Sequence, residues 1–296
     1  MALPTTQAEL LLDLKAALGE GALWNPLTAR LNFVDIAGKK VHEYDPGTRA
    51  LRSWATPEKV GTVVPRRSGG LVVALAGGVA ALNTASGQLT FLAKPAEHDP
   101  AQCRFNDGKC DPQGRLWAGT MSITEKKGQG ALYCFAPGAS PRQVLTDIGI
   151  SNGLVWSVDG TRFYYIDSLT ARIDVFDFDS ASGNLRNRRT AFAVPEGQGL
   201  PDGSTLDAEG MLWVCHWDGW QVSRWDPVRG VCLAVVKVDA PQVTSCAFGG
   251  PDLKTLYITS AREGMTAEQL AQAPASGGLF VCHPGVAGIP AGIYAG

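Results

Sequence analysis

The chain has 296 residues, of which 45% are hydrophobic and 18% are charged, and its formal net charge at pH 7 is −2. This length and apolar content are sufficient to bury a large core. So small a net charge gives no field that would hold nucleic acid or an anionic membrane. We therefore expect a small-molecule partner, no nucleic acid, no membrane, and a monomer or weak oligomer.

The amino-terminal stretch MALPTTQAELLLDLKAAL has no basic region, no small-residue cleavage site and no long apolar run. It predicts neither a signal peptide nor a membrane anchor, so we expect a cytoplasmic protein. The seven cysteines are scattered without a CxxC pair. They are interpreted as reduced packing residues, because neither a disulfide framework nor a zinc knuckle fits that spacing.

A turn followed by a short apolar strand recurs along the chain. The six copies are NPLTARLNFVDI from Asn25, RRSGGLVVAL from Arg66, DPQGRLWAGTM from Asp111, SVDGTRFYYIDS from Ser157, DAEGMLWVCHW from Asp207 and GPDLKTLYITS from Gly250. Their apolar anchors are Leu31, Leu71, Leu116, Phe163, Leu212 and Leu256, so the period lies between 40 and 49 residues. Each copy is followed by a second strand–turn–strand phrase, such as YDPGTRAL or VFDFDSASGNL.

Two such phrases per period give four strands per unit, which is the composition of a propeller blade. The sequence therefore predicts an all-β protein, a six-bladed β-propeller that occupies residues 1–296 as a single domain. A β-sandwich or two tandem all-β domains would not produce this period six times. The segment Leu10–Leu14 could add a strand to the last blade and close the ring, which removes sheet edges. A short helix is expected in an insertion at about 262–276, where the chain reads TAEQLAQA.

Polar residues recur at one phase of the repeat, ten or eleven positions before the anchors. Four of the six positions hold carboxylate or amide side chains, namely Glu20, Asn106, Asn152 and Asp202. Equivalent positions on inner strands of a propeller converge on the central channel. A glycine next to each polar residue would let the backbone pass close to the axis.

Carboxylate and amide oxygens are hard ligands that suit calcium, magnesium or manganese, while zinc and ferrous iron remain open. Asn-Gly and Asp-Gly pairs also occur simply as turns. Turns that only link strands would carry Ser or Gly equally well at this phase, and two converging acids repel unless a cation or proton lies between them. The pattern therefore predicts one divalent metal ion.

These phrases resemble the family of sugar lactonases that includes regucalcin (senescence marker protein) and gluconolactonase. The resemblance runs from LGEGALW through RFNDGKCDPQGRLWAGTM, ISNGLVW, LPDGSTL and SCAFGGPDLKTLYITSAR to the carboxy-terminal YAG. It implies a six-bladed propeller with one divalent metal held by Glu20, Asn152 and Asp202. It also implies substrate contacts from Arg104 and Asn106. Animal members place a glutamate after the AGTM phrase, and here Glu125 lies about one residue out of step with it.

The resemblance implies hydrolysis of an aldonolactone, such as glucono-, galactono-, xylono- or arabinono-lactone. Because Asp202 would be held near the ion, we expect it to act as the catalytic base that takes a proton from the attacking water. A serine hydrolase is disfavoured, because no G-x-S-x-G elbow is present. The four histidines form no metal-binding pair, and only His216 is expected at a pocket wall. Two other functions remain open: a calcium-binding regulatory protein without significant catalysis, and an organophosphate hydrolase of the paraoxonase-like propeller type.

Overall fold

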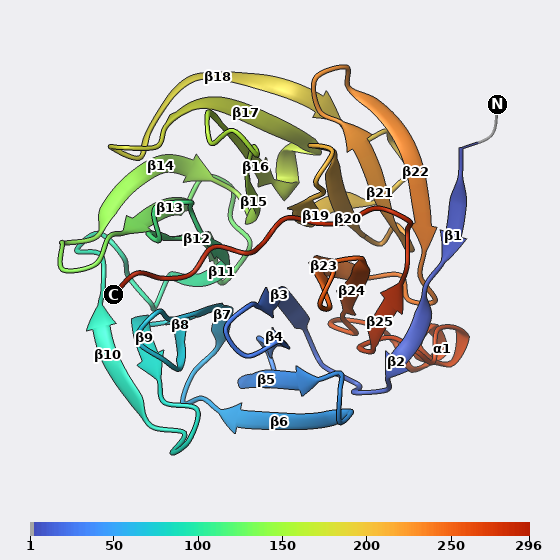
Figure 1. Cartoon of the computed structure of the whole chain (residues 1–296), viewed down its shortest axis with the longest axis horizontal. Helices are drawn as coiled ribbons and strands as arrows, with labels where there is room; N and C mark the ends of the chain where they lie inside the picture. The colour runs from blue at the N-terminus through green and yellow to red at the C-terminus, as the bar shows by residue number, and fades with distance from the viewer. Residues whose placement is uncertain (1–2) are drawn as a thin grey trace.

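The structure is a computed structural model that describes residues 3–296. Six antiparallel sheets surround a central channel and form a six-bladed β-propeller, as the repeat predicted. The first strand of each blade lies next to the channel and the fourth lies on the rim (Figure 1). The six apolar anchors lie on the second strands, where each is at most 1% exposed.

The strands follow the chain from blade to blade. Blade 1 contains β3 (Gly19–Asn25), β4 (Arg30–Asp35), β5 (Lys40–Asp45) and β6 (Ala50–Ala55). Blade 2 contains β7 (Val60–Pro65), β8 (Leu71–Leu75), β9 (Gly78–Leu82) and β10 (Leu89–Ala93). Blade 3 contains β11 (Cys103–Cys110), β12 (Leu116–Ser122), β13 (Gly130–Phe135) and β14 (Arg142–Ile148). Blade 4 contains β15 (Ser151–Trp156), β16 (Arg162–Asp167), β17 (Arg172–Asp179) and β18 (Asn184–Ala193), with the 3-10 helix η1 (Ser168–Thr170) between β16 and β17.

The last two blades also take strands from the amino-terminal segment. Blade 5 contains β19 (Leu200–Leu206), β20 (Leu212–Trp217), β21 (Gln221–Asp226) and β22 (Val231–Lys237). Blade 6 contains β23 (Val243–Gly249), β24 (Thr255–Ser260) and β25 (Leu279–Cys282). Strand β2 (Glu9–Leu12) pairs antiparallel with β25 and completes blade 6, so the ring is closed by the segment that the sequence indicated. Strand β1 (Thr5–Gln7) pairs parallel with β22, an addition that the sequence did not predict.

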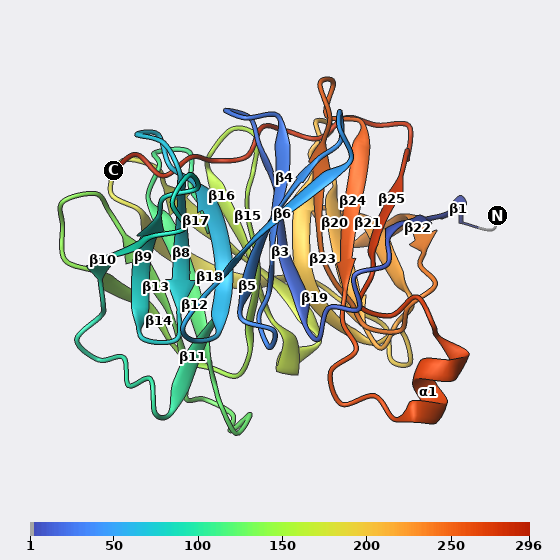
Figure 2. The ribbon, with the colours of Figure 1, turned by 90° about the horizontal axis from the view of Figure 1, so that it is seen from below.

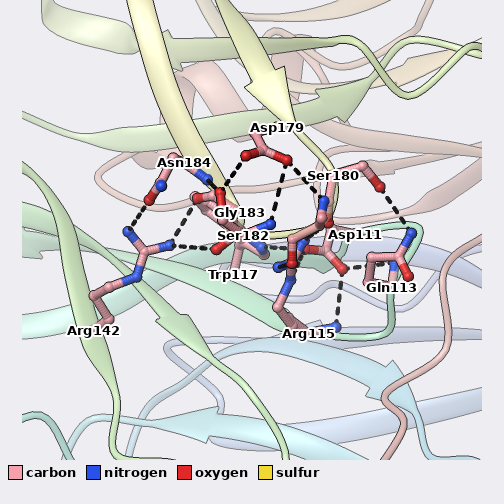
Figure 3. Close-up of polar contacts among 11 residues, drawn as sticks. Asp111, Gln113, Arg115, Trp117, Arg142, Asp179, Ser180, Ser182, Gly183 and Asn184 are labelled. Carbon is pink, nitrogen blue, oxygen red and sulfur yellow. Dashed lines mark hydrogen bonds and ion pairs between the residues drawn. The ribbon is translucent and has the colours of Figure 1, made fainter.

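The turn phrases of blades 3 and 5 are each fixed by one buried aspartate. Asp111 Oδ1 accepts from the backbone N–H groups of Gln113 and Arg115, at 2.9 and 3.0 Å. Its Oδ2 accepts from Trp117 Nε1 at 2.9 Å and from Arg115 Nε at 2.5 Å (Figure 3). Asp207 repeats this arrangement with the indole of Trp213. Each carboxylate therefore ties the turn to the aromatic core of its own blade.

The two faces of the ring differ. Helix α1 (Ala267–Gln272), which lies within the 262–276 segment, projects from one face, and the carboxy-terminal segment crosses the other (Figure 2). Each inner strand begins at the face that carries α1. All seven cysteines are free thiols. Within residues 3–296, no helix is long and apolar enough to cross a membrane.

Candidate functional site

Every inner strand has a register irregularity close to the phase at which the polar residues recur. The pairing shifts between Glu20 and Leu23, between Asn152 and Leu154, and between Pro201 and Ser204. The pairing of β7, β11 and β23 with the second strands of their blades shifts at the same level. A β-bulge re-aims side chains and increases local twist. The six bulges together explain how side chains from separate blades can turn toward one axis.

Glycines allow the inner strands to approach each other at this level. A Cβ atom added to Gly203 would lie 2.7 Å from the backbone oxygen of Thr244, on the neighbouring inner strand. A Cβ atom on Gly61 would collide with the backbone of Phe105 in the same way. Gly21 has φ of +62°, a left-handed conformation that favours glycine. Close packing at the axis therefore requires glycine at positions 61 and 203, and the backbone conformation favours it at position 21.

The polar residues line one cavity of about 190 Å³ at the face that carries α1. All the metal, catalytic and substrate residues that the sequence indicated contribute to its wall: Glu20, Arg104, Asn106, Glu125, Asn152 and Asp202. Five of them come from the inner strands β3, β11, β15 and β19, and Glu125 comes from the turn after β12. Apolar side chains complete the wall, among them Met121, Leu169 and Trp217.

A chain of hydrogen bonds fixes the amides of this cavity. Arg104 Nη1 donates to Asn106 Oδ1 at 2.6 Å, and Asn106 Nδ2 donates to Asn152 Oδ1 at 3.0 Å and to the Ser151 carbonyl at 2.9 Å. Asn152 Nδ2 in turn donates to Ser168 Oγ at 2.8 Å, and that hydroxyl donates to the carbonyl of Pro201 at 2.6 Å. Since both amide nitrogens are committed to protein acceptors, the orientation of Asn152 is fixed, with its oxygen as the acceptor.

Three acids are buried around the end of the channel. Burial raises the pKa of Glu20 to about 8, with a further contribution from the negative charge of Asp107. Burial raises the pKa of Asp202 well above its ordinary value, and the neighbouring charge of Glu20 adds to the shift. Burial likewise raises the pKa of Asp107, whose Oδ2 has no hydrogen-bond partner in the described chain. A cation between these acids would relieve both the repulsion and the cost of burial.

The donor set of this cavity fits a divalent cation. Glu20 and Asp202 supply carboxylate oxygens, and Asn152 supplies an amide oxygen, the chemistry that hard cations prefer. No group of three or more His, Cys, Asp or Glu side chains placed to hold a metal occurs in residues 3–296. The set here combines two acids with an amide. The third proposed ligand, the amide oxygen of Asn152, comes from a residue type other than these four.

Several residues of the site were not singled out from the sequence. Ser168 lies on η1 and orients Asn152, and Glu263 lines the cavity from the segment after β24. Both lie in connections between strands, where residues do not recur at a fixed position of the repeat. Asp107 could have been noticed, since it follows Asn106 directly. His216 does not line this cavity: it is fully buried, with Nδ1 donating to the Gln198 carbonyl and Nε2 accepting from Ser223 Oγ.

Comparisons with known proteins cover nearly the whole chain. Residues 18–262 match the family profile described as SMP-30/Gluconolactonase/LRE-like region. Regucalcin from Danio rerio is 42% identical over 293 residues, which cover 98% of this chain and 99% of that protein. A solved structure from Agrobacterium tumefaciens, described as a calcium-binding protein, regucalcin, has a TM-score of 0.94 at 29% identity and covers 99% of both chains. A luciferin-regenerating enzyme has a TM-score of 0.90 at 32% identity over 97% of this chain and 99% of its own.

Proposed function

Because the chain belongs to the SMP-30/gluconolactonase/LRE-like family, we propose that it is a metal-dependent lactonase that opens the ring of an aldonolactone to give the aldonic acid. Glucono-, galactono-, xylono- and arabinono-lactone are the candidate substrates. The observation that carries the proposal is the convergence of two carboxylates, an oriented amide and an arginine in one small cavity.

Glu20, Asn152 and Asp202 are the proposed ligands of one divalent ion. Calcium is the first candidate, because the regucalcin from Agrobacterium tumefaciens is described as calcium-binding. Zinc, magnesium, manganese and ferrous iron offer the same charge. A bound divalent ion supplies polarisation of a carbonyl oxygen and lowers the pKa of bound water.

Asp202 is the proposed catalytic base. It lines the cavity as one of its two most deeply buried carboxylates and is 5% exposed. In the proposed step, Asp202 takes a proton from water as the water oxygen bonds to the lactone carbonyl carbon. The bond from that carbon to the ring oxygen then breaks, and the ring oxygen leaves as the hydroxyl group of the open acid after it takes up a proton.

Arg104 is the proposed substrate anchor. Within residues 3–296, only its Nη1 donates to protein acceptors, namely Asn106 Oδ1 and the carbonyl of Phe105. Its other N–H groups remain for the carbonyl and hydroxyl oxygens of the substrate, a task that suits the rigid guanidinium fork. Asn106 uses its amide on Arg104, Ser151 and Asn152. We therefore assign Asn106 mainly to positioning, and Glu125 at the rim to a hydroxyl of the sugar.

The size of the cavity favours a single small ring over a larger substrate. About 190 Å³ lies below the usual range of roughly 300–1,000 Å³ for drug-sized ligands. The wall of the cavity combines polar residues of the inner strands with apolar side chains such as Leu169 and Trp217. A monosaccharide lactone could place its carbonyl toward Arg104 and Asp202 while a face of its ring packs against the apolar wall.

The test is a panel of aldonolactones assayed after chelation and reloading with each metal, with aryl phosphotriesters as a second panel. The proposal predicts lactone turnover that depends on the added metal. Tight calcium binding without hydrolysis of any lactone would favour the calcium-binding regulator instead. Hydrolysis of the phosphotriesters alone would favour the organophosphate hydrolase.

The role of Asp202 can be tested separately with Asp202→Asn, which keeps the shape of the side chain but removes its charge and basicity. Metal content has to be measured on the same sample, since lost metal and a lost base both lower the rate. A metal-loaded variant that retains full turnover would contradict the base assignment.

A further inference from the structure

A second cavity lies at the other end of the central channel. Its volume is about 360 Å³, compared with about 190 Å³ for the candidate site. Its walls come from the later residues of the inner strands, including Trp24 on β3, Trp156 on β15 and Phe248 on β23. The candidate site is built from the beginnings of the same strands, so the two cavities belong to opposite faces of the ring.

The carboxy-terminal segment roofs this second cavity. Residues 289–292 line it, in the part of the chain that crosses the face opposite α1 (Figure 2). The segment is fixed on both sides of the cavity, since Gly288 N–H donates to the Leu253 carbonyl at 2.8 Å and Tyr294 N–H donates to the Pro65 carbonyl at 2.9 Å. Between these points, residues 289–293 make no backbone–backbone hydrogen bond within the described chain. The roof is held there by side-chain packing, with Ile289 and Ala291 packed against core clusters of the blades.

The chemistry of the wall selects one class of ligand. Trp24, Trp156 and Phe248 contribute aromatic surface to the wall, with 4–6% of each residue exposed, and such surface favours planar rings. Trp156 is 6% exposed, and its indole N–H has no hydrogen-bond acceptor in the described chain. Lys109 is the only residue of the wall with a full charge, and one hydrogen bond to the Ser204 carbonyl leaves two of its three N–H bonds for another acceptor. The wall contains no acidic side chain.

We propose that this cavity is a second small-molecule site, which binds a planar aromatic anion independently of the lactone site. The carboxylate or sulfonate of the ligand would lie at Lys109, and its ring would pack against the apolar and aromatic wall. The volume falls within the roughly 300–1,000 Å³ range of small-molecule sites, and an apolar wall with a few directed polar groups is typical of them.

The first experiment is a fluorescence titration with 8-anilinonaphthalene-1-sulfonate. The native protein should bind one equivalent with saturation. Ala291→Phe places a phenyl ring in the roof and should weaken binding at least tenfold. The matched control is Ala287→Phe, on the same segment but outside the wall, and it should bind as the native protein does. Lactone hydrolysis by both variants should be unchanged, which would show that the propeller is intact.

The second experiment tests the charge and the independence of the site. Native protein should prefer the sulfonate over the neutral analogue N-phenyl-1-naphthylamine, and Lys109→Met should lose that preference. The readout is a ratio of two affinities, because Lys109 also lies near Asp107 and its loss could affect the other cavity. Equal binding by Ala291→Phe and native protein, no saturable binding, or displacement of the sulfonate probe by a lactone would overturn the proposal.

Discussion

Arg104 carries the positive charge of the candidate site, but its charge is of no use for holding a metal ion. Burial lowers its pKa, and the carboxylates of Glu263, Glu20, Asp202 and Glu125 act in the opposite direction. Arg104→Ala should therefore lower kcat/KM by about 10- to 1000-fold, a loss of roughly 1.4–4 kcal/mol of transition-state stabilisation. Metal affinity should be unchanged or slightly higher, because a like charge is removed.

Hydrolysis rate and metal titration on the same purified Arg104→Ala sample decide this prediction. A protein that only binds metal would show the affinity effect alone. Unchanged hydrolysis would remove Arg104 from the substrate site.

Ser168 should act on the metal through Asn152, because its hydroxyl connects the Asn152 amide to the carbonyl of Pro201. Ser168→Ala should weaken metal binding by about 10- to 100-fold, the usual effect of losing a group that orients a ligand. The matched control is Thr170→Ala, on the same 3-10 helix, since Thr170 Oγ1 bonds only the Asp167 carbonyl in the described part of the chain. Calorimetric metal titrations that give equal affinities for the two variants would contradict the role of Ser168.

His216 should make the fold sensitive to mild acid. Burial lowers its pKa from 6.5 to about 4. Above pH 6.5 the imidazole is neutral in both states and contributes no pH dependence. As the pH falls from 6.5 to 4, the unfolded chain takes up a proton that the folded protein excludes, so stability is lost across this window, by about 2 kcal/mol at pH 5.

Urea unfolding at pH 7.5 and pH 5 measures this loss for the native protein and for His216→Gln. The glutamine amide can still donate to the Gln198 carbonyl and accept from Ser223, but it does not titrate. The variant should lose about 2 kcal/mol less than the native protein between the two pH values. An identical pH dependence of both proteins would show that His216 is not responsible.

At the scale of the elements, the Asp111 turn holds blade 3 together and also joins it to blade 4. Arg115, paired with Asp111, donates to the carbonyls of Ser180 and Ala181, and Arg142 donates to the Gly183 carbonyl (Figure 3). Blade 3 is thereby tied to the β17–β18 turn of blade 4. The side chain of Arg115 is only 11% exposed. Loss of Asp111 would therefore leave a largely buried positive charge without its partner.

Asp111→Ala should therefore lower the free energy of unfolding by about 3–5 kcal/mol, as expected when one partner of a buried ion pair is removed. Asp159→Ala is the control: Asp159 occupies the corresponding turn of blade 4, but it is exposed and bonds only its own turn. Its removal should cost far less. Chemical denaturation of both variants is the measurement, and equal losses would contradict the role given to the buried carboxylate.

The repeat predicted the elements well where each blade has a periodic pattern. Six apolar anchors and their turn phrases placed the second strands of all six blades. The parallel pairing of β1 with β22 was missed because three exposed residues, Thr5–Gln7, carry no apolar alternation. The path of the carboxy-terminal segment across one face was also missed, since a segment without strand or helix leaves no period to detect.

At the scale of the whole molecule, the ring brings residues from distant parts of the chain to one axis. The phase of the repeat was sufficient to place Glu20, Asn152 and Asp202 around one cavity, because equivalent positions of a closed ring must converge. Ser168 and Glu263 could not be found in this way. They reach the cavity from loops of different length, and their position depends on three-dimensional packing that the sequence pattern does not encode.

The proposed lactonase activity of the whole ring depends on one metal ion at its axis. The most direct measurement is lactone hydrolysis after chelation, with the metal content of the sample determined by elemental analysis. Hydrolysis should be lost with the metal and should return with about one equivalent of a divalent cation. Full activity in a sample shown to contain no metal would contradict this dependence.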